Sequence, residues 1–250
     1  MVVGGKETTS FMSGFLEKCG GGGYGVLDGG FATELERHGA DLNDPLWSAK
    51  CLLTSPHLVR RVHLDYLDAG ANIITTASYQ ATIQGFEAKG FSREEGEDLL
   101  RKSVKLAREA RDIYNDRCTK DSSDFITHGR YWKRPILIAA SVGSYGAYLA
   151  DGSEYRGDYG DAVTVETLKE FHRKSCRDES NVASGDSISE CASIADSCKK
   201  VVAVGVNCTA PRFIQGLISS ITKVTSKPVL VYPNSGETYD AESKQWVVSS

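Results

Sequence analysis

Two residues at the ends of predicted strands carry side chains that could take part in chemistry. Cys208 lies in Gly205-Val206-Asn207-Cys208-Thr209, where a strand-end side chain would point into the mouth of a barrel and not into its packed interior. Its thiol is either a small core group or a reactive or metal-bound thiolate. Asp28 ends the apolar run Val26-Leu27-Asp28 and precedes two glycines. Its carboxylate either caps the helix that follows or receives the ammonium group of a substrate.

The remaining candidates form no complete site by local spacing. The glycine-rich run 20–25 precedes the first strand, whereas a dinucleotide-binding fingerprint follows a strand and opens a helix, so residues 1–25 are predicted to be a flexible leader. Cys191 and Cys198 are seven residues apart on the apolar face of a predicted helix, where two thiols pack as small hydrophobes. No H-E-x-x-H or C-x-x-C spacing is present, so no local motif makes a metal site.

Short apolar segments predict the strands that would position Asp28 and Cys208. The segment 135–140 is almost wholly apolar, which is typical of a parallel sheet covered on both faces. Helices are predicted between such segments, and informative polar residues follow the strands directly. This alternation predicts a parallel α/β fold and favours a barrel whose loops line a site. The predicted strands are 26–28, 72–76, 135–140, 201–206 and 228–232.

Capping residues and spacing predict the helices. Ser55-Pro56 provides an N-cap with proline at the first helical position, and Ser92 with Glu95 forms a capping box. After the first of these caps, apolar and aromatic residues recur at helical spacing and are expected to form one buried face. They are Val59, Val62, Tyr66 and Ala69.

The alternation is interrupted once. A helix predicted from 164 to about 172 is followed by a polar stretch, 173–186, and then by a second helix that opens at the capping box of Ser187 and Glu190. No strand is predicted between these helices. About five strands are expected, whereas a closed (β/α)8 TIM-type barrel has eight. We therefore expect an incomplete barrel domain over 26–250, interrupted near 173–186 and truncated after 250.

Composition and charge narrow the class of protein. The chain has 250 residues, of which 40% are hydrophobic and 25% charged, enough to bury a core. Its net charge of −4 leaves no positive excess to neutralise a phosphate backbone, which excludes nucleic acid as a main partner. No segment predicts a membrane helix or a signal peptide. The odd number of cysteines, 7, fits reduced thiols, and we expect a cytoplasmic protein.

Five segments in order resemble the homocysteine S-methyltransferase family, nearest the branch that uses S-methylmethionine. They extend over nearly the whole chain, and their order makes the resemblance more specific than any single motif. The segments are Leu27-Asp28-Gly29-Gly30-Phe31-Ala32-Thr33-Glu34-Leu35, Ile74-Thr75-Thr76-Ala77-Ser78-Tyr79-Gln80-Ala81, Ser141-Val142-Gly143-Ser144-Tyr145-Gly146-Ala147, Val204-Gly205-Val206-Asn207-Cys208 and Tyr232-Pro233-Asn234-Ser235-Gly236-Glu237.

The resemblance implies a (β/α)8 barrel in which three cysteines bind Zn²⁺, one from a Gly-x-Asn-Cys block and two adjacent ones from a late Gly-Gly-Cys-Cys block. Zinc would bind the homocysteine sulfur and leave it as a thiolate that attacks a methyl group on a sulfonium. Cys208 matches the first zinc ligand, and Asp28 matches the acidic residue that helps to bind the homocysteine amino group. The residues that would line the site are Thr76, Ser144, Tyr145 and Asn207.

The chain departs from the family pattern in two places. Between Phe171-His172 and Ser184-Gly185-Asp186 the family has another strand, a helix and a further strand, including a Glu-Thr that contacts the substrate. The paired cysteines are the second departure, since no Cys-Cys pair occurs in the 250 residues. The missing strands correspond to the fourth, fifth and eighth of the barrel, and two of three zinc ligands have no counterpart.

The resemblance implies zinc-dependent methyl transfer from S-methylmethionine, or S-adenosylmethionine, to homocysteine, giving methionine. The partners are then small-molecule substrates, with no nucleic acid and no membrane. The alternative is a catalytically inactive splice or gene-model variant of such an enzyme, which would act at most as a binding protein.

Overall fold

The chain divides into two compact units. One consists of Val26–Asn181, and the other consists of Met1–Gly25 together with Val182–Ser250. The computed structural model describes residues 11–19, 24–121, 134–149, 153, 159–160, 162–164, 166–168, 171, 188–207, 211–233, 237–240 and 245–248. Within these ranges the protein is α/β, as predicted.

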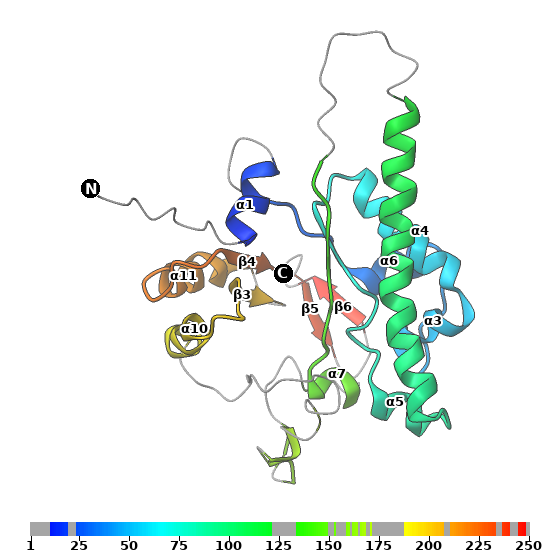
Figure 1. Cartoon of the computed structure of the whole chain (residues 1–250). Coiled ribbons are helices and arrows are strands. Elements are labelled where there is room, and N and C mark those ends of the chain that lie inside the picture. The colour runs from blue at the N-terminus through cyan, green and yellow to red at the C-terminus, as the bar shows by residue number, and fades with distance from the viewer. Residues whose placement is uncertain are drawn as a thin grey trace. The chain divides into compact units, whose positions relative to one another are not determined.

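The unit Val26–Asn181 contains the long helix α6 (Arg93–Asp121; Figure 1) and a sheet of two parallel strands, to which a third segment is joined by a single bridge. Strands β1 (Ile73–Thr75) and β2 (Leu137–Ala139) pair in parallel. Leu27 forms an isolated parallel bridge to Ile73 at the other edge of β1. The strands predicted at 72–76 and 135–140 are confirmed, and the one predicted at 26–28 is reduced to this bridge. Because carboxyl ends of parallel strands meet at one edge, the residues that follow these three segments lie close together.

The helices predicted from capping signals are present in this unit. Helix α6 (Arg93–Asp121) opens at a capping box, because the Glu95 N–H donates to Ser92 Oγ (3.2 Å) and the Ser92 N–H donates to Glu95 Oε2 (2.7 Å). Ser55 is the N-cap of α4 (Pro56–Asp68), although its side chain makes no capping hydrogen bond there. Helix α2 (Phe31–Arg37) ends before Gly39, whose φ of +83° lies in the left-handed region that favours glycine.

Short helices in the same unit escaped the sequence analysis, since a helix of five or six residues shows too little periodicity to be recognised. They are the 3-10 helix η1 (Trp47–Ala49), α3 (Lys50–Thr54), α5 (Ile83–Ala88) and α7 (Tyr145–Leu149).

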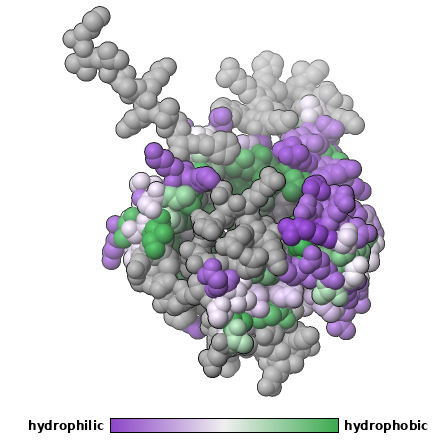
Figure 2. All heavy atoms as spheres, turned by 60° about the horizontal axis from the view of Figure 1, so that its bottom comes forward, coloured by the Kyte–Doolittle hydropathy of each residue, from purple (hydrophilic) through white to green (hydrophobic). Residues whose placement is uncertain are grey.

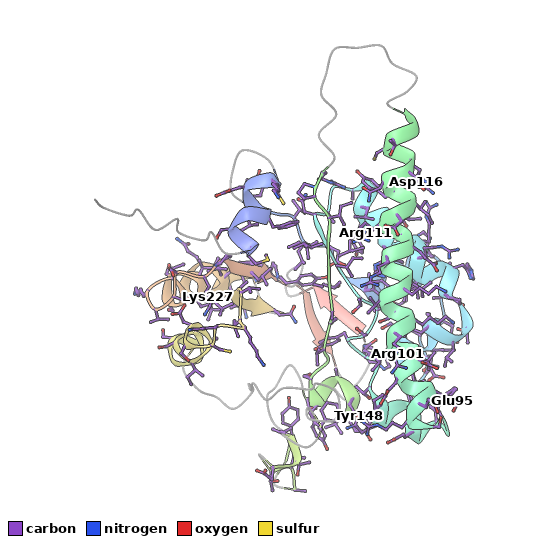
Figure 3. The ribbon with its side chains drawn as sticks, viewed as in Figure 1. Glu95, Arg101, Arg111, Asp116, Tyr148 and Lys227 are labelled. Atoms are coloured by element: carbon purple, nitrogen blue, oxygen red, sulfur yellow. The ribbon has the colours of Figure 1, made fainter. Side chains whose placement is uncertain are left out.

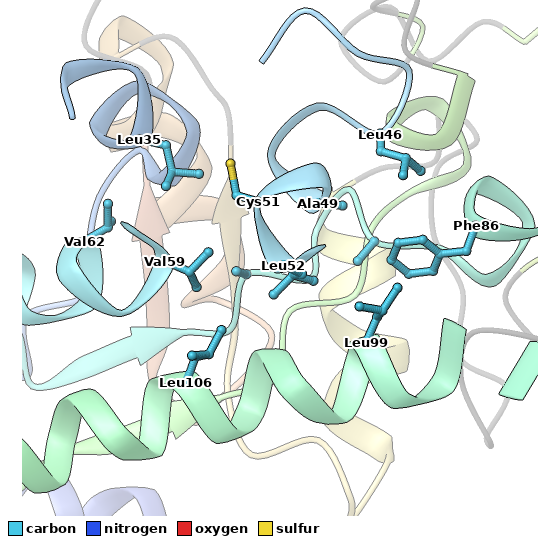
Figure 4. Close-up of a cluster of buried hydrophobic side chains, with 12 residues drawn as sticks. Leu35, Leu46, Ala49, Cys51, Leu52, Val59, Val62, Phe86, Leu99 and Leu106 are labelled. Carbon is cyan, nitrogen blue, oxygen red and sulfur yellow. The ribbon is translucent and has the colours of Figure 1, made fainter. Parts of the chain in front are cut away.

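The main hydrophobic core lies between α4, α6 and the short helices (Figure 4). Several of its members have no exposed surface, and burying a Leu, Val or Phe side chain stabilises a fold by about 1.5–3 kcal/mol. They include Leu35, Leu52, Val59, Val62 and Phe86. Charged side chains lie along α6, as Figure 3 shows for Glu95, Arg101, Arg111 and Asp116. Figure 2 shows hydrophilic side chains gathered where α6 lies, at the right of the view.

The second unit contains a β-α-β arrangement. Strands β3 (Val204–Asn207) and β4 (Val229–Tyr232) pair in parallel and are joined by α11 (Pro211–Ile221). Both strands and the helix agree with the sequence prediction. The core of this unit contains Ala192, Val206 and Ile221, the first of which comes from α10 (Ile188–Ser197). The Lys227 ammonium donates to the Ala195 and Cys198 carbonyls (3.2 and 3.3 Å), which satisfies acceptors left over at the end of α10.

Two elements of the second unit differ from the sequence analysis. Helix α1 (Phe11–Lys18) lies inside the segment 1–25 predicted as a flexible leader, and it buries Met12 and Phe15. Met12 and Phe15, three residues apart, thus lie on one face of this helix. Strands β5 (Glu237–Asp240) and β6 (Gln245–Val248) form an antiparallel hairpin that was not predicted.

The strands of the described ranges form three two-stranded sheets, and no closed barrel occurs among them. The barrel therefore stays a prediction, whereas the α/β class is confirmed. In the interrupted region, the described residues Glu166–Leu168 are helical, in agreement with the helix expected from 164, and the capping box of Ser187 and Glu190 lies outside the described side chains. No helix in the described part of the chain is long and apolar enough to cross a membrane.

Candidate functional site

Asp28 lies where the first parallel segment meets the end of β1. Its backbone N–H donates to the Ile73 carbonyl (2.9 Å), which continues the bridge made by Leu27. Its carboxylate accepts the Thr75 N–H at Oδ2 (2.6 Å) and the Thr75 hydroxyl at Oδ2 and Oδ1 (3.0 and 3.2 Å). Both donors belong to Thr75, so the carboxylate is oriented by β1.

The environment of Asp28 makes its negative charge unfavourable in the empty protein. The residue is only 5% exposed, and burial raises the pKa of its carboxyl to about 6, although the hydrogen bonds from Thr75 act to lower it. Among the described residues, no cationic side chain pairs with this carboxylate. A buried carboxylate held by donors but left without a counter-ion is suited to receive a cationic group from a ligand.

The structure contradicts the interpretation of Asp28 as a helix cap. The N-cap of α2 is Gly30, and no side chain caps that position. The carboxylate turns toward Thr75 instead, because the parallel bridge at Leu27 places residue 28 beside the end of β1. Of the two alternatives left open by the sequence, reception of a ligand cation is the one compatible with this geometry.

Thr76 belongs to a ring of hydrogen bonds that ties the ends of β1 and β2 together. The Ser141 N–H donates to Thr76 Oγ1 (2.9 Å), and Ser78 Oγ donates to the Ser141 carbonyl (2.8 Å). The hydroxyls of Thr76 and Ser78 are 2.6 Å apart, and since Ser78 donates to Ser141, Thr76 donates to Ser78. All three residues follow parallel strands, so this ring fixes the loops next to Asp28.

We expect Thr76→Val to lower the free energy of unfolding by about 1–3 kcal/mol, because it keeps the side-chain shape but leaves the Ser141 N–H without an acceptor and removes the hydrogen bond that Thr76 donates to Ser78. Thr76→Ser keeps the hydroxyl and should cost much less. Urea unfolding of both variants measures the difference. Equal stability of the valine and serine variants would contradict the role of the ring.

Ser144 and Tyr145 are engaged within the fold next to the same loops. Ser144 Oγ accepts the Ala147 N–H (3.2 Å) in the first turn of α7. The Tyr145 ring packs edge-to-face on Tyr159 and Phe171, with centroid distances of 5.6 and 5.2 Å, and lies 5.9 Å from the Tyr148 ring. The contact of Ser144 and Tyr145 with substrate stays a prediction.

Asn207 and Cys208 belong to the second unit. Asn207 is the last residue of β3, opposite Tyr232 of β4, and is exposed. Cys208, the predicted zinc ligand, lies outside the described residues. The cysteines among the described side chains that form no disulfide are Cys19, Cys51, Cys118 and Cys198. Cys198 follows α10 and is half-buried, whereas the side chain of Cys191 is outside the described set.

Glu34, His38 and Asp65 form a titratable cluster between α2 and α4 whose spacing could suit a metal ion. His38 Nε2 lies 2.6 Å from Asp65 Oδ2 and 3.8 Å from Glu34 Oε1. The carboxylates also pair with arginines, Arg37 with Glu34 (3.0 Å) and Arg61 with Asp65 (2.8 Å). This cluster is an ion-pair network, and it offers none of the thiolates that the resemblance implies for zinc.

Sequence reasoning missed two residues that shape this site, Thr75 and Tyr66. Thr75 is adjacent to the predicted Thr76, and its role depends on strand pairing. Tyr66 was counted as part of the apolar face of α4, but its hydroxyl donates to the Gly30 carbonyl (3.0 Å). The two glycines after Asp28 indicated that another side chain approaches the backbone there, but they do not identify Tyr66 as that side chain.

A model of the family described as homocysteine S-methyltransferase matches residues 25–181 and 174–250. The chain belongs to this family. The resemblance seen in the sequence is thereby confirmed. The two matched segments meet at the region where the alternation of strands and helices is interrupted.

Members of the family with known names are similar over most of their length. "Homocysteine S-methyltransferase 3" from Arabidopsis thaliana is 56% identical over 288 aligned positions, covering 98% of this chain and 82% of the relative. "Selenocysteine Se-methyltransferase" from Brassica oleracea var. italica is also 56% identical and covers 99% and 83%. The crystal structure of the homocysteine methyltransferase MmuM from Escherichia coli in its metallated form is 35% identical, with a TM-score of 0.69, covering 88% of this chain and 86% of MmuM.

Proposed function

We propose that the protein binds homocysteine and transfers a methyl group to its sulfur from a sulfonium donor, S-methylmethionine or S-adenosylmethionine, giving methionine. One observation carries the proposal: the carboxylate of Asp28 is buried, oriented by Thr75 and without a cationic partner among the described residues. The ammonium group of an amino acid is the counter-ion that such a carboxylate lacks. Because the chain belongs to the homocysteine S-methyltransferase family, we propose homocysteine as this amino acid.

In the proposed reaction, Asp28 holds the amino acid and thereby orients its sulfur. The bound ammonium neutralises the buried carboxylate, so binding removes an unfavourable charge that exists in the empty protein. The homocysteine thiol releases its proton to solvent, and the thiolate sulfur forms a bond to the methyl carbon while the bond from that carbon to the sulfonium breaks, its electron pair returning to the donor sulfur. Alignment of the two sulfurs about the methyl group is the main contribution expected of the protein.

The donor set for zinc is incomplete in these residues. Zinc bound to the homocysteine sulfur would supply its deprotonation, and we propose Cys208 as one protein ligand. The 250 residues contain no adjacent cysteines. In the cluster of Glu34, His38 and Asp65, the two carboxylates form ion pairs with arginines. The residues therefore do not fit a site of three thiolates, and the steps above use only the groups of this chain and its substrates.

We also propose that the strands are parts of a (β/α)8 barrel interrupted near 173–186. The parallel pairs β1–β2 and β3–β4 support it, as do the two segments matched by the family model. An alignment of 288 positions for a chain of 250 residues means that the Arabidopsis relative has residues without a counterpart here.

The internal interruption near 173–186 favours a second candidate function, a protein that binds homocysteine without methylating it. Asp28 would keep its role, because its geometry depends only on the unit Val26–Asn181. Such a protein would be the inactive variant anticipated from the sequence.

The test combines binding and turnover on the purified chain. Homocysteine binding is measured by calorimetry with and without added zinc, and methionine is quantified after incubation with each sulfonium donor. Binding with turnover supports the enzyme, and binding without turnover supports the second candidate. Absence of homocysteine binding with zinc present would contradict both.

Selenocysteine is the alternative methyl acceptor to test, because one similar relative is named a selenocysteine Se-methyltransferase. Running both acceptors in the same assay shows which one the chain prefers. Asp28→Asn should reduce the binding of either, because both carry the same ammonium group.

A further inference from the structure

We propose that Tyr66 is a positioning residue for Asp28, which acts by holding the turn Gly29-Gly30 against the last turn of α4. The phenol hydroxyl donates to the Gly30 carbonyl at 3.0 Å, across 36 residues of sequence. The same carbonyl accepts the Glu34 N–H (3.2 Å), the first hydrogen bond of α2. Tyr66 thus holds in place the residues between Asp28 and the start of α2.

Gly29 shows how closely the phenol approaches this turn. A Cβ on residue 29 would lie 2.9 Å from Tyr66 Cε1, 3.0 Å from its hydroxyl oxygen and 3.2 Å from Cζ. A methyl group at position 29 would therefore force the phenol ring to shift. A Cβ on Gly30 would instead meet its nearest atom, Thr33 Oγ1, at 3.4 Å.

The two sides of Asp28 are therefore fixed by different elements. Thr75 in β1 holds the carboxylate, and Tyr66 in α4 holds the backbone that follows it. If either anchor is lost, the carboxylate can rotate toward water and away from a bound ammonium. A hydroxyl serves this purpose only while it is protonated, and burial, together with the nearby charges of Glu34 and Asp28, raises the pKa of Tyr66 to about 12.

The first experiment compares Tyr66→Phe with Tyr114→Phe, a matched variant in the same unit whose hydroxyl accepts from Arg134 (3.0 Å). The inference rests on the proposed function only for its binding readout. We expect Tyr66→Phe to weaken homocysteine binding by about three- to tenfold, the effect of one neutral hydrogen bond, and Tyr114→Phe to leave it unchanged.

A second readout needs no substrate. Carbon-13 NMR of the Asp28 carboxyl in the empty protein should show its pKa falling from about 6 toward 3.8 in Tyr66→Phe, because a loosened turn admits water, and staying unchanged in Tyr114→Phe. A lower thermal midpoint with unchanged pKa and affinity would overturn the inference and leave Tyr66 a packing residue. If the unsubstituted chain binds no homocysteine, the proposed function fails, and the carboxyl pKa alone still decides the role of Tyr66.

The contact with Gly29 is tested by a double-mutant cycle. Gly29→Ala should displace the phenol and shift the Asp28 pKa as Tyr66→Phe does, whereas Gly30→Ala has room for its methyl group and serves as control. In a Tyr66→Ala background, Gly29→Ala should cause less than a third of that shift. Equal shifts in both backgrounds would show that residue 29 acts independently of Tyr66 and would overturn the inference.

Discussion

Asp28→Asn is expected to make the empty protein more stable at pH 7 while removing most of its affinity for homocysteine. The amide has the shape of the carboxylate and can still accept the Thr75 N–H, but it carries no charge to bury. The pKa of the carboxyl rises from 3.8 to about 6, which corresponds to about 3 kcal/mol. The free energy of unfolding should increase by up to that amount, and the affinity should fall roughly hundredfold, because the bound ammonium loses its charged partner.

The size of this effect depends on pH. A carboxyl whose pKa is raised by folding stabilises the protein in its protonated form, so its contribution is complete below pH 3.8 and is lost as the pH rises through about 6. The advantage of Asp28→Asn should therefore be full at pH 7 and vanish near pH 4. Urea unfolding at both pH values and calorimetry with homocysteine measure it, with the exposed Asp112→Asn as control. A variant that is destabilised at pH 7 and binds homocysteine normally would contradict the assignment.

His63→Leu is expected to protect the protein against acid. His63 lies on α4 with no exposed surface, packs 5.1 Å from the Phe31 ring, and neither of its ring nitrogens has a hydrogen-bond partner among the described residues. Burial lowers its pKa from 6.5 to about 4, which corresponds to about 3 kcal/mol. A histidine whose pKa is lowered by folding stabilises the protein in its neutral form. That contribution is complete above pH 6.5 and is lost as the pH falls through about 4.

The leucine variant cannot be protonated, so it should gain about 3 kcal/mol over the unsubstituted protein at pH 4 or below. At pH 7 it should gain a further 1–2 kcal/mol, roughly the cost of burying unpaired polar nitrogens. His57→Leu is the matched control, because His57 is exposed on the same helix. Acid titration followed by circular dichroism gives the midpoints. If both variants unfold at the same pH as the unsubstituted protein, the buried imidazole does not set its acid limit.

Asp28 and His63 act in opposite directions over nearly the same pH range. As the pH falls from 6.5 to 4, protonation of Asp28 increases the free energy of unfolding. Over the same range the unfolded state takes up a proton on His63 more readily than the folded state does, which decreases it. The unsubstituted protein should therefore show a flatter stability profile in this range than either variant.

The elements predicted from sequence were those with strong local signals. The capping box at Ser92 and the proline at position 56 gave the starts of α6 and α4, and continuous apolar runs gave β1 to β4. The helix α7 and the hairpin β5–β6 were missed because short elements of this kind depend on tertiary packing.

The candidate site was predictable only in part. Asp28 stood out because a carboxylate followed a strand, but its orientation depends on a partner 47 residues away. Local reasoning considered the nearest backbone, the start of α2, and so a helix cap was an open alternative that proved wrong. The periodicity that placed Tyr66 on the apolar face of α4 describes its ring correctly and says nothing of its hydroxyl.

The shortest bond to Asp28 is donated by a main-chain N–H, that of Thr75. Every amino acid except proline can provide this donor, so this bond survives most single substitutions at position 75, although the bonds from the Thr75 hydroxyl do not. An insertion or deletion of one residue in this stretch would instead turn this N–H toward the opposite edge of the strand, away from the segment that contains Asp28. Relatives that diverge from this chain should therefore vary in the side chain at position 75 more freely than in the number of residues around it.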